Sequence, residues 1–78
     1  QGNFRVYPNP TKSDINLVFP KGIHQAYIEV YDILGKKIFK QSVLSGEGSV
    51  SLRNLDSGVY LAKITAGNVT ETIKIIKE

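Results

Sequence analysis

Cysteine, methionine and tryptophan are absent from the 78 residues, and histidine occurs once, at His24. Without cysteine the chain can form neither a disulfide nor a thiolate metal site. A chain of this length makes one small domain, which buries only about 60% of the surface that its unfolded form exposes. Nearly all of the apolar side chains are therefore needed for the core, and little room is left for a buried catalytic site.

Long apolar runs are absent as well. No stretch approaches the ~18 apolar residues of a membrane helix, so we expect a chain that does not span a membrane. Because the first residue is Gln1 rather than methionine, we expect residues 1–78 to be a single domain from a larger protein, and any export signal of that protein to lie elsewhere. The net charge of +3 comes from dispersed lysines and arginines, with Lys36-Lys37 as the one adjacent pair. Since nucleic-acid binders concentrate such charge in a stripe, we predict no nucleic-acid partner.

Groups that could carry out chemistry are scarce. His24 lies in a polar stretch, and as a general base it would need a nucleophile and an orienting partner within reach. The serines do not match a nucleophile elbow, and the dispersed carboxylates match neither a calcium hand nor a zinc site. We therefore predict a protein that is not an enzyme and that has no metal or cofactor; a calcium site built from loop carbonyls stays open.

Apolar and polar residues alternate along most of the chain, and Gly, Pro, Asn and Asp fall between the alternating runs. A period of two, filled with β-branched and aromatic residues, is typical of half-buried strands. The sequence predicts about seven strands, at 3–7, 14–19, 26–32, 37–43, 48–52, 59–66 and 69–77. Turn signals about every ten residues favour an all-β fold, namely an Ig-like antiparallel β-sandwich of Greek-key type.

Two hairpins can be predicted in detail. Asp32 and Gly35 suit the first and fourth positions of a type I turn, in which the glycine takes a positive φ, and this register sets Val30 opposite Ile38 on the core side. Gly67-Asn68 suits a two-residue hairpin that makes one face of the C-terminal ribbon apolar and the other polar. The exception is Glu71, which this register places on the inner side opposite Ile64. We read 46–48 as a third hairpin tip.

The first hairpin also predicts a surface feature. It places Phe39 outside, opposite Glu29, and turns Tyr27 and Tyr31 away from the core on the same face. A strip of exposed aromatic rings with polar neighbours is a candidate contact surface. The alternative is that these three rings cover the sheet or pack against a preceding domain.

Two further segments are structural. Leu55, Gly58 and Tyr60 have the spacing of a tyrosine corner, in which the hydroxyl bonds to the backbone a few residues upstream and fixes the crossover between sheets. Tyr7-Pro8-Asn9-Pro10 forms a rigid corner, because each proline fixes its own φ and pushes the preceding residue toward extended geometry. We expect Phe4, Val6 and Tyr7 to dock the first edge strand.

Taken together, four segments resemble the C-terminal sorting domains of the type IX (Por) secretion system of Bacteroidetes. The segments are Tyr7-Pro8-Asn9-Pro10, residues 28–37, residues 55–60 and the lysine-containing terminal strand that ends at Glu78. The resemblance implies an Ig-like sandwich attached to a cargo that passes through the periplasm to the cell surface or the medium. It implies recognition by the secretion machinery, removal by an outer-membrane sortase and no catalysis. It assigns recognition to Gly58, Tyr60 and the terminal run Lys74, Ile75, Ile76, Lys77 and Glu78.

The residues add a hypothesis about how recognition works. A terminal strand can offer its backbone edge to a partner's sheet, and Lys74 and Lys77 could steer it toward acidic surfaces. An edge strand could also support a weak dimer. Two other readings stay open: a carbohydrate-binding module that uses Tyr27, Tyr31 and Phe39, and a purely structural spacer beside a secreted enzyme.

Overall fold

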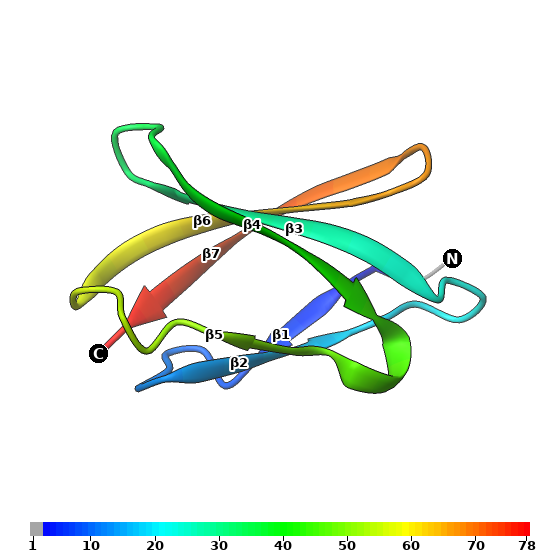
Figure 1. Cartoon of the computed structure of the whole chain (residues 1–78), viewed down its shortest axis with the longest axis horizontal. Helices are drawn as coiled ribbons and strands as arrows, with labels where there is room; N and C mark the ends of the chain where they lie inside the picture. The colour runs from blue at the N-terminus through cyan, green and yellow to red at the C-terminus, as the bar shows by residue number, and fades with distance from the viewer. Residues whose placement is uncertain (1–2) are drawn as a thin grey trace.

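A computed structural model describes residues 3–78 as two antiparallel sheets packed face to face (Figure 1). The order along the chain is β1 (Arg5–Tyr7), β2 (Asp14–Val18), β3 (Gln25–Asp32), β4 (Lys37–Leu44), a 3₁₀ turn η1 (Ser45–Glu47), β5 (Ser49–Ser51), β6 (Gly58–Ala66) and β7 (Val69–Lys77). One sheet has the order β1-β2-β5 and the other has the order β4-β3-β6-β7. The prediction of a seven-stranded Ig-like sandwich is confirmed, and no strand end differs from the predicted one by more than two residues.

The core lies between the two sheets, where the alternating apolar residues of both sheets meet. Every second residue of β3 and β6 is buried, as the period of two predicts. The buried apolar side chains are Phe4, Ile15, Leu17, Ala26, Ile28, Val30, Val43, Val50, Leu52, Tyr60, Ala62, Ile64 and Ile75. Phe4 and Val6 dock β1 on this core as expected, whereas Tyr7 is 56% exposed. The docking role predicted for Tyr7 is therefore wrong, because alternation along β1 turns it to the outside.

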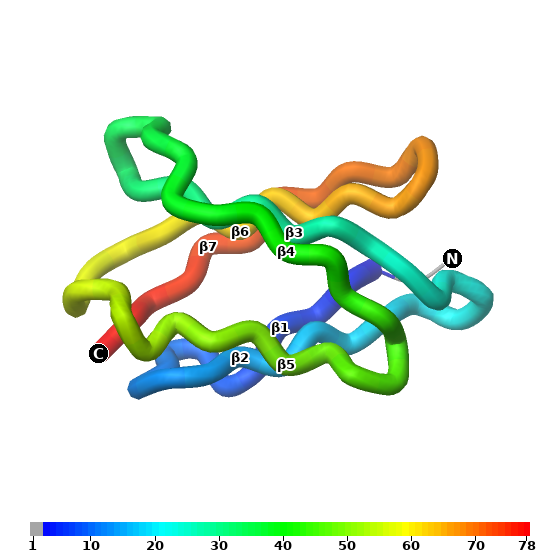
Figure 2. Tube along the Cα trace, viewed as in Figure 1, coloured from blue at the N-terminus to red at the C-terminus, as the bar shows by residue number. Residues whose placement is uncertain are grey.

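The connection from β4 to β5 crosses from one sheet to the other, as the tube in Figure 2 shows. The hairpin predicted at 46–48 is therefore wrong: β5 pairs with β2, and η1 makes the crossing. Gly48 follows η1 directly and contacts the backbone of Leu17, whose amide donates to the Gly48 carbonyl (2.7 Å). The glycines of this segment thus permit a close approach to β2 rather than a tight turn.

The β3–β4 hairpin closes at Asp32 and Gly35 as predicted. The Asp32 carboxylate accepts from the amides of Leu34 and Lys36, both at 2.9 Å, and Gly35 has φ +87°. The predicted register is wrong by one residue, since Val30 pairs with Phe39. The pairing shifts between Val30 and Tyr31, which pairs with Lys37, so a β-bulge absorbs the intervening residue of β4.

The β6–β7 ribbon follows its predicted register along its whole length. Ala66 pairs with Val69 around Gly67, which has φ +60°, and Ile64 pairs with Glu71. Glu71 faces inward near the open end of the sandwich, where its carboxylate accepts from the Phe4 amide at 2.9 Å. The ribbon therefore also holds Phe4, just before β1.

Candidate functional site: the terminal ribbon and its outer face

The entrance to β6 is fixed by a tyrosine corner. The Tyr60 hydroxyl donates to the carbonyl of Asp56 at 2.7 Å, and the ring is buried with the core. Leu55 packs against the same core from the preceding loop. The tyrosine corner is confirmed, and it leaves Tyr60 as a residue that shapes the ribbon, because ring and hydroxyl are both engaged within the domain.

The last strand divides its side chains between the two faces. Ile75 is fully buried, and Lys77 is only 8% exposed. The ammonium group of Lys77 donates to the carbonyls of Leu55 (3.1 Å) and Glu78 (3.5 Å). The prediction that Lys77 steers the domain toward acidic surfaces is therefore wrong, since its charge is turned inward to the backbone. Lys74 and Ile76 point outward.

The free edge of β7 is occupied near its C-terminal end by residues 9–11, which we call the clasp. The Asn9 carboxamide donates to the Lys74 carbonyl at 2.7 Å and accepts from the Ile76 amide at 2.9 Å. Thr11 continues the contact, since its amide donates to the Ile76 carbonyl (2.9 Å) and its carbonyl accepts from the Glu78 amide (2.8 Å). The prediction of a backbone edge open to a partner strand is therefore wrong for Lys74–Glu78.

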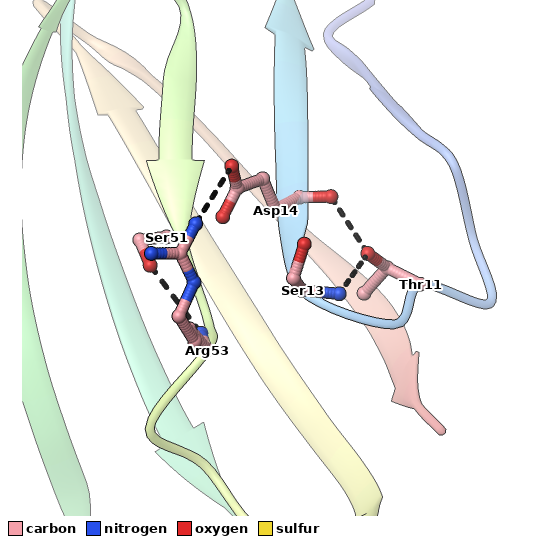
Figure 3. Close-up of polar contacts among 5 residues, drawn as sticks. All are labelled: Thr11, Ser13, Asp14, Ser51 and Arg53. Carbon is pink, nitrogen blue, oxygen red and sulfur yellow. Dashed lines mark hydrogen bonds and ion pairs between the residues drawn. The ribbon is translucent and has the colours of Figure 1, made fainter.

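The clasp is anchored on the start of β2 through Thr11 (Figure 3). Thr11 is 2% exposed; its hydroxyl donates to the Asp14 carbonyl at 2.6 Å and accepts from the Ser13 amide at 3.2 Å. Asp14 in turn lies 3.9 Å from the Arg53 guanidinium, and the Ser51 hydroxyl accepts from the Arg53 amide at 3.3 Å. The clasp therefore links the edge of β7 in one sheet to the start of β2 in the other.

The outer face is the side of the four-stranded sheet that is turned away from the three-stranded sheet. Cross-strand pairs arrange the side chains of this face in rows. The first row has members from β6 and β7 only, and the others run across the sheet in the order β4, β3, β6, β7. Beginning at the end near Gly58, the rows are Val59 with Ile76; Lys37, Tyr31, Leu61 and Lys74; Lys40, Glu29, Lys63 and Thr72; and Ser42, Tyr27, Thr65 and Thr70. The rows hold four lysines and one carboxylate, so the face is basic.

Two contacts organise these charges. The ammonium group of Lys37 lies 3.0 Å from the Glu29 carboxylate. This hydrogen bond lowers the pKa of Glu29 and raises the pKa of Lys37 from their ordinary values. Lys40 instead lies over the ring of Tyr27, 4.8 Å from its centroid, which is a cation–π distance. Lys63 and Lys74 complete the basic face from β6 and β7.

The predicted aromatic strip is confirmed in part. Tyr27, 46% exposed, and Tyr31, half-buried, lie on the outer face. The placement of Phe39 is wrong, because the bulge turns it inward opposite Val30, where it packs against the core. Sequence reasoning missed the exposed aliphatic residues that replace it on this face, Val59, Leu61 and Ile76, which are 37–40% exposed.

A groove of about 490 Å³ lies beside η1, with His24 and Ser45 in its lining. The lining has no carboxylate that could orient the imidazole, so the groove offers no acid–base relay. Among residues 3–78, no three His, Cys, Asp or Glu side chains lie close enough together to bind a metal ion. Within the same residues no helix is long and apolar enough to cross a membrane.

Comparison with known proteins decides the family. A family model described as "Secretion system C-terminal sorting domain" matches residues 5–78. The chain belongs to the type IX sorting domains. The resemblance predicted from the four sequence segments is thus confirmed. Domains of this family act with the type IX machinery on a cargo that is secreted or displayed at the cell surface.

Two curated relatives carry similar segments. An endo-acting ulvan lyase of Formosa agariphila is 39% identical over 67 residues, which cover 82% of this chain and 12% of that protein. A funoran endo-beta-hydrolase of Wenyingzhuangia aestuarii is 28% identical over 64 residues, covering 81% of this chain and 9% of that protein. The chain thus spans about a tenth of the length of these relatives, and their enzymatic names describe the cargo to which the sorting domain is attached.

Proposed function

We propose that the secretion machinery reads the folded β6–β7 ribbon, from Gly58 to Glu78, as the sorting signal. One observation carries the proposal: β7 places Lys74 and Ile76 in solvent while Ile75 and Lys77 lock the same strand onto the core. A signal of this kind is read through side chains on a rigid sheet. Gly58 and Tyr60 contribute by fixing the entry of β6.

The clasp bears on how this ribbon is contacted. A partner that added a strand to β7 would compete with four hydrogen bonds to the backbone of residues 74–78, two from the Asn9 side chain and two from the Thr11 backbone. Contact with the outward side chains competes with none of them. We therefore place recognition on the outer side of the ribbon.

We also propose that a surface sortase removes the domain after export. The cargo then stays at the surface, joined to an anionic lipopolysaccharide, or enters the medium. The support is the family to which the chain belongs. The cleavage site would lie near or before Gln1. The domain itself performs no catalysis, and the periplasm is its compartment in transit.

A fusion tests the sorting role. Residues 1–78 are attached to the C-terminus of an unrelated reporter that carries a periplasmic signal peptide. We expect the reporter to leave the cell in a bacterium with a type IX system and to stay in the periplasm when that system is deleted. A reporter that stays in the periplasm of both strains would overturn the proposal. A reporter that is exported from both strains would overturn it too, because its export would not depend on the type IX system.

Point variants of the fusion test the ribbon. Deleting 74–78 is unsuitable, because it also removes buried Ile75 and the partners of the clasp. Ile76→Gln changes only an outward side chain, and we expect it to lower export about tenfold, as loss of a central contact residue does. Val18→Gln, which changes a 40% exposed apolar residue of β2 in the other sheet, is the matched control. Export of both variants at the wild-type level would overturn the ribbon as the signal.

A second candidate function is binding of a polysaccharide by the outer face. It is favoured by the 46% exposed ring of Tyr27 and the half-buried ring of Tyr31 on that face; ulvan and funoran, the polysaccharides in the names of the relatives' cargo enzymes, serve as probes. Titration of the isolated chain with both polysaccharides tests it. Binding that is lost in Tyr31→Ala while export persists would favour this function over sorting.

A further inference from the structure

The outer face carries more than the ribbon. We call Tyr31, Val59, Leu61 and Ile76 the outer patch. Leu61 pairs directly with Tyr31 of β3, and Val59 pairs with Ile76 of β7, so the four side chains adjoin on three strands. The three aliphatic members are 37–40% exposed. Apolar side chains that gather on a sheet face rather than scatter over the surface are typical of a contact site.

Lysines surround this patch on three sides. Lys37 and Lys74 stand at the two ends of the row that contains Tyr31 and Leu61, and Lys63 follows Leu61 on the same face of β6. Glu29 bonds Lys37, which leaves Lys63 and Lys74 as the charges that a partner meets beside the aliphatic residues. An apolar centre with a basic rim is complementary to an acidic surface with an apolar centre.

The patch also lies away from the start of β1. In Figure 1 β1 begins, in dark blue, toward one end of the long axis and β7 ends, in red, at the other end; Figure 2 shows the same separation. Ile76 is two residues from Glu78, so the patch belongs to the C-terminal end. Asn3 and the start of β1 lie toward the other end, which leaves the patch accessible to a separate partner.

We propose that the outer patch and its lysines dock on an acidic protein surface with an apolar centre, presented by the secretion machinery. The proposal rests on the proposed sorting function and extends the site beyond the ribbon to β3 and β4. A second copy of the chain is disfavoured as the occupant, because a symmetric pair would bring two faces together that each hold four lysines and one carboxylate. A polysaccharide is disfavoured as well, because sugars stack on aromatic rings and Val59, Leu61 and Ile76 are aliphatic.

The test uses the same reporter fusion with two kinds of variant. Lys63→Glu/Lys74→Glu reverses the charge beside the patch, and Val59→Thr/Leu61→Thr makes its centre polar while keeping or raising β-propensity. We expect each to lower export about tenfold relative to wild type. Lys12→Glu/Lys21→Glu, which changes exposed lysines outside the four-stranded sheet, should leave export unchanged. Thermal melts of the isolated chains check folding, and Lys63→Gln/Lys74→Gln replaces the charge reversal if that variant does not fold.

The outcomes separate the two proposals. If the wild-type fusion is not exported, the sorting function fails; if wild type and both patch variants are exported equally, only the docking surface fails. A loss confined to the lysine variant would indicate a polyanion, such as a sulfated polysaccharide or an anionic lipid surface, and would overturn a protein partner. The isolated chain could also sediment as a dimer, while the Val59→Thr/Leu61→Thr variant sediments as a monomer. That result would identify a second copy of the chain as the occupant and would overturn docking on the secretion machinery.

Discussion

The side chain of Asn9 accepts a hydrogen bond from the backbone amide of Ile76 (2.9 Å), although 67 residues separate them in sequence. The same carboxamide donates to the Lys74 carbonyl at 2.7 Å, so one side chain mimics the backbone of an added strand. This contact explains why Tyr7-Pro8-Asn9-Pro10 and the terminal strand occur together: the first segment closes the edge of the second. An edge closed in this way is protected from uncontrolled strand pairing.

Asn9→Ala is expected to lower the free energy of unfolding by about 1–2 kcal/mol, since two hydrogen bonds to exposed backbone groups are lost. Hydrogen exchange measures the effect directly, because the Ile76 amide should lose protection more than other amides of β7. Asn54→Ala, in the exposed loop before β6, is the control. Unchanged protection at Ile76 would mean that the clasp does not hold the strand.

The tyrosine corner gives a second prediction. Tyr60→Phe keeps the buried ring but leaves the Asp56 carbonyl without its 2.7 Å bond, which should cost about 1–2 kcal/mol in chemical denaturation. Tyr27→Phe removes a hydroxyl from a 46% exposed ring and should change stability by less than about 0.5 kcal/mol. Equal effects of the two substitutions would contradict a structural role for the Tyr60 hydroxyl.

The two lysines of the terminal strand should behave differently. Lys77→Met preserves the buried stem but removes the donor to the Leu55 carbonyl, so we expect a loss of about 1–2 kcal/mol. Lys74→Met alters an outward side chain and should stay within about 0.5 kcal/mol of wild type. Export should show the reverse ranking in our proposal, with Lys74→Met the more defective. A Lys77→Met variant as stable as wild type would contradict the inward role.

Much of the fold was predictable because local rules agree with the tertiary structure. Period-two alternation located the strands, Asp32 with Gly35 and Gly67 with Asn68 specified two turns, and the spacing of Leu55 and Tyr60 specified the corner. These signals depend on residues that are close in sequence. The family resemblance then supplied a function that no single residue chemistry indicates.

The rest depends on contacts between distant residues. The bulge turns Phe39 inward, where its ring packs against the core beside Val30. This packing is a tertiary contact that favours the bulged register. The inward turn of Lys77 depends on the Leu55 carbonyl, 22 residues away. Lys77 follows Ile73 and Ile75 at a spacing of two and pairs with Gly58 on the inner face, although lysine ordinarily keeps its charge in water.

Acid should lower the stability of the domain through protonation of Glu29 on the outer face. Its folded-state pKa is lowered below 4.5 by the hydrogen bond from Lys37, so its contribution to stability is present above the unfolded pKa and is lost as pH falls through the folded pKa. Glu29→Gln should therefore melt at a lower temperature than wild type at about pH 7, and the two melting curves should converge below pH 4.5. A difference that persists or grows in acid would contradict the pairing. Melts at high salt should reduce the difference, because the pair is at the surface.

Gly48 and Gly46 form a matched pair on either side of Glu47. A Cβ at Gly48 would clash with the backbone carbonyl of Leu17, whereas a Cβ at Gly46 has nothing within 4 Å. Because φ at Gly48 is −75°, backbone conformation does not penalise alanine there, and the clash alone decides the effect. We expect Gly48→Ala to cost about 1–3 kcal/mol, as overpacking does, and Gly46→Ala to be neutral or to stabilise by up to about 1 kcal/mol. Urea denaturation of both variants measures this, and a neutral Gly48→Ala would show that η1 can move away from β2.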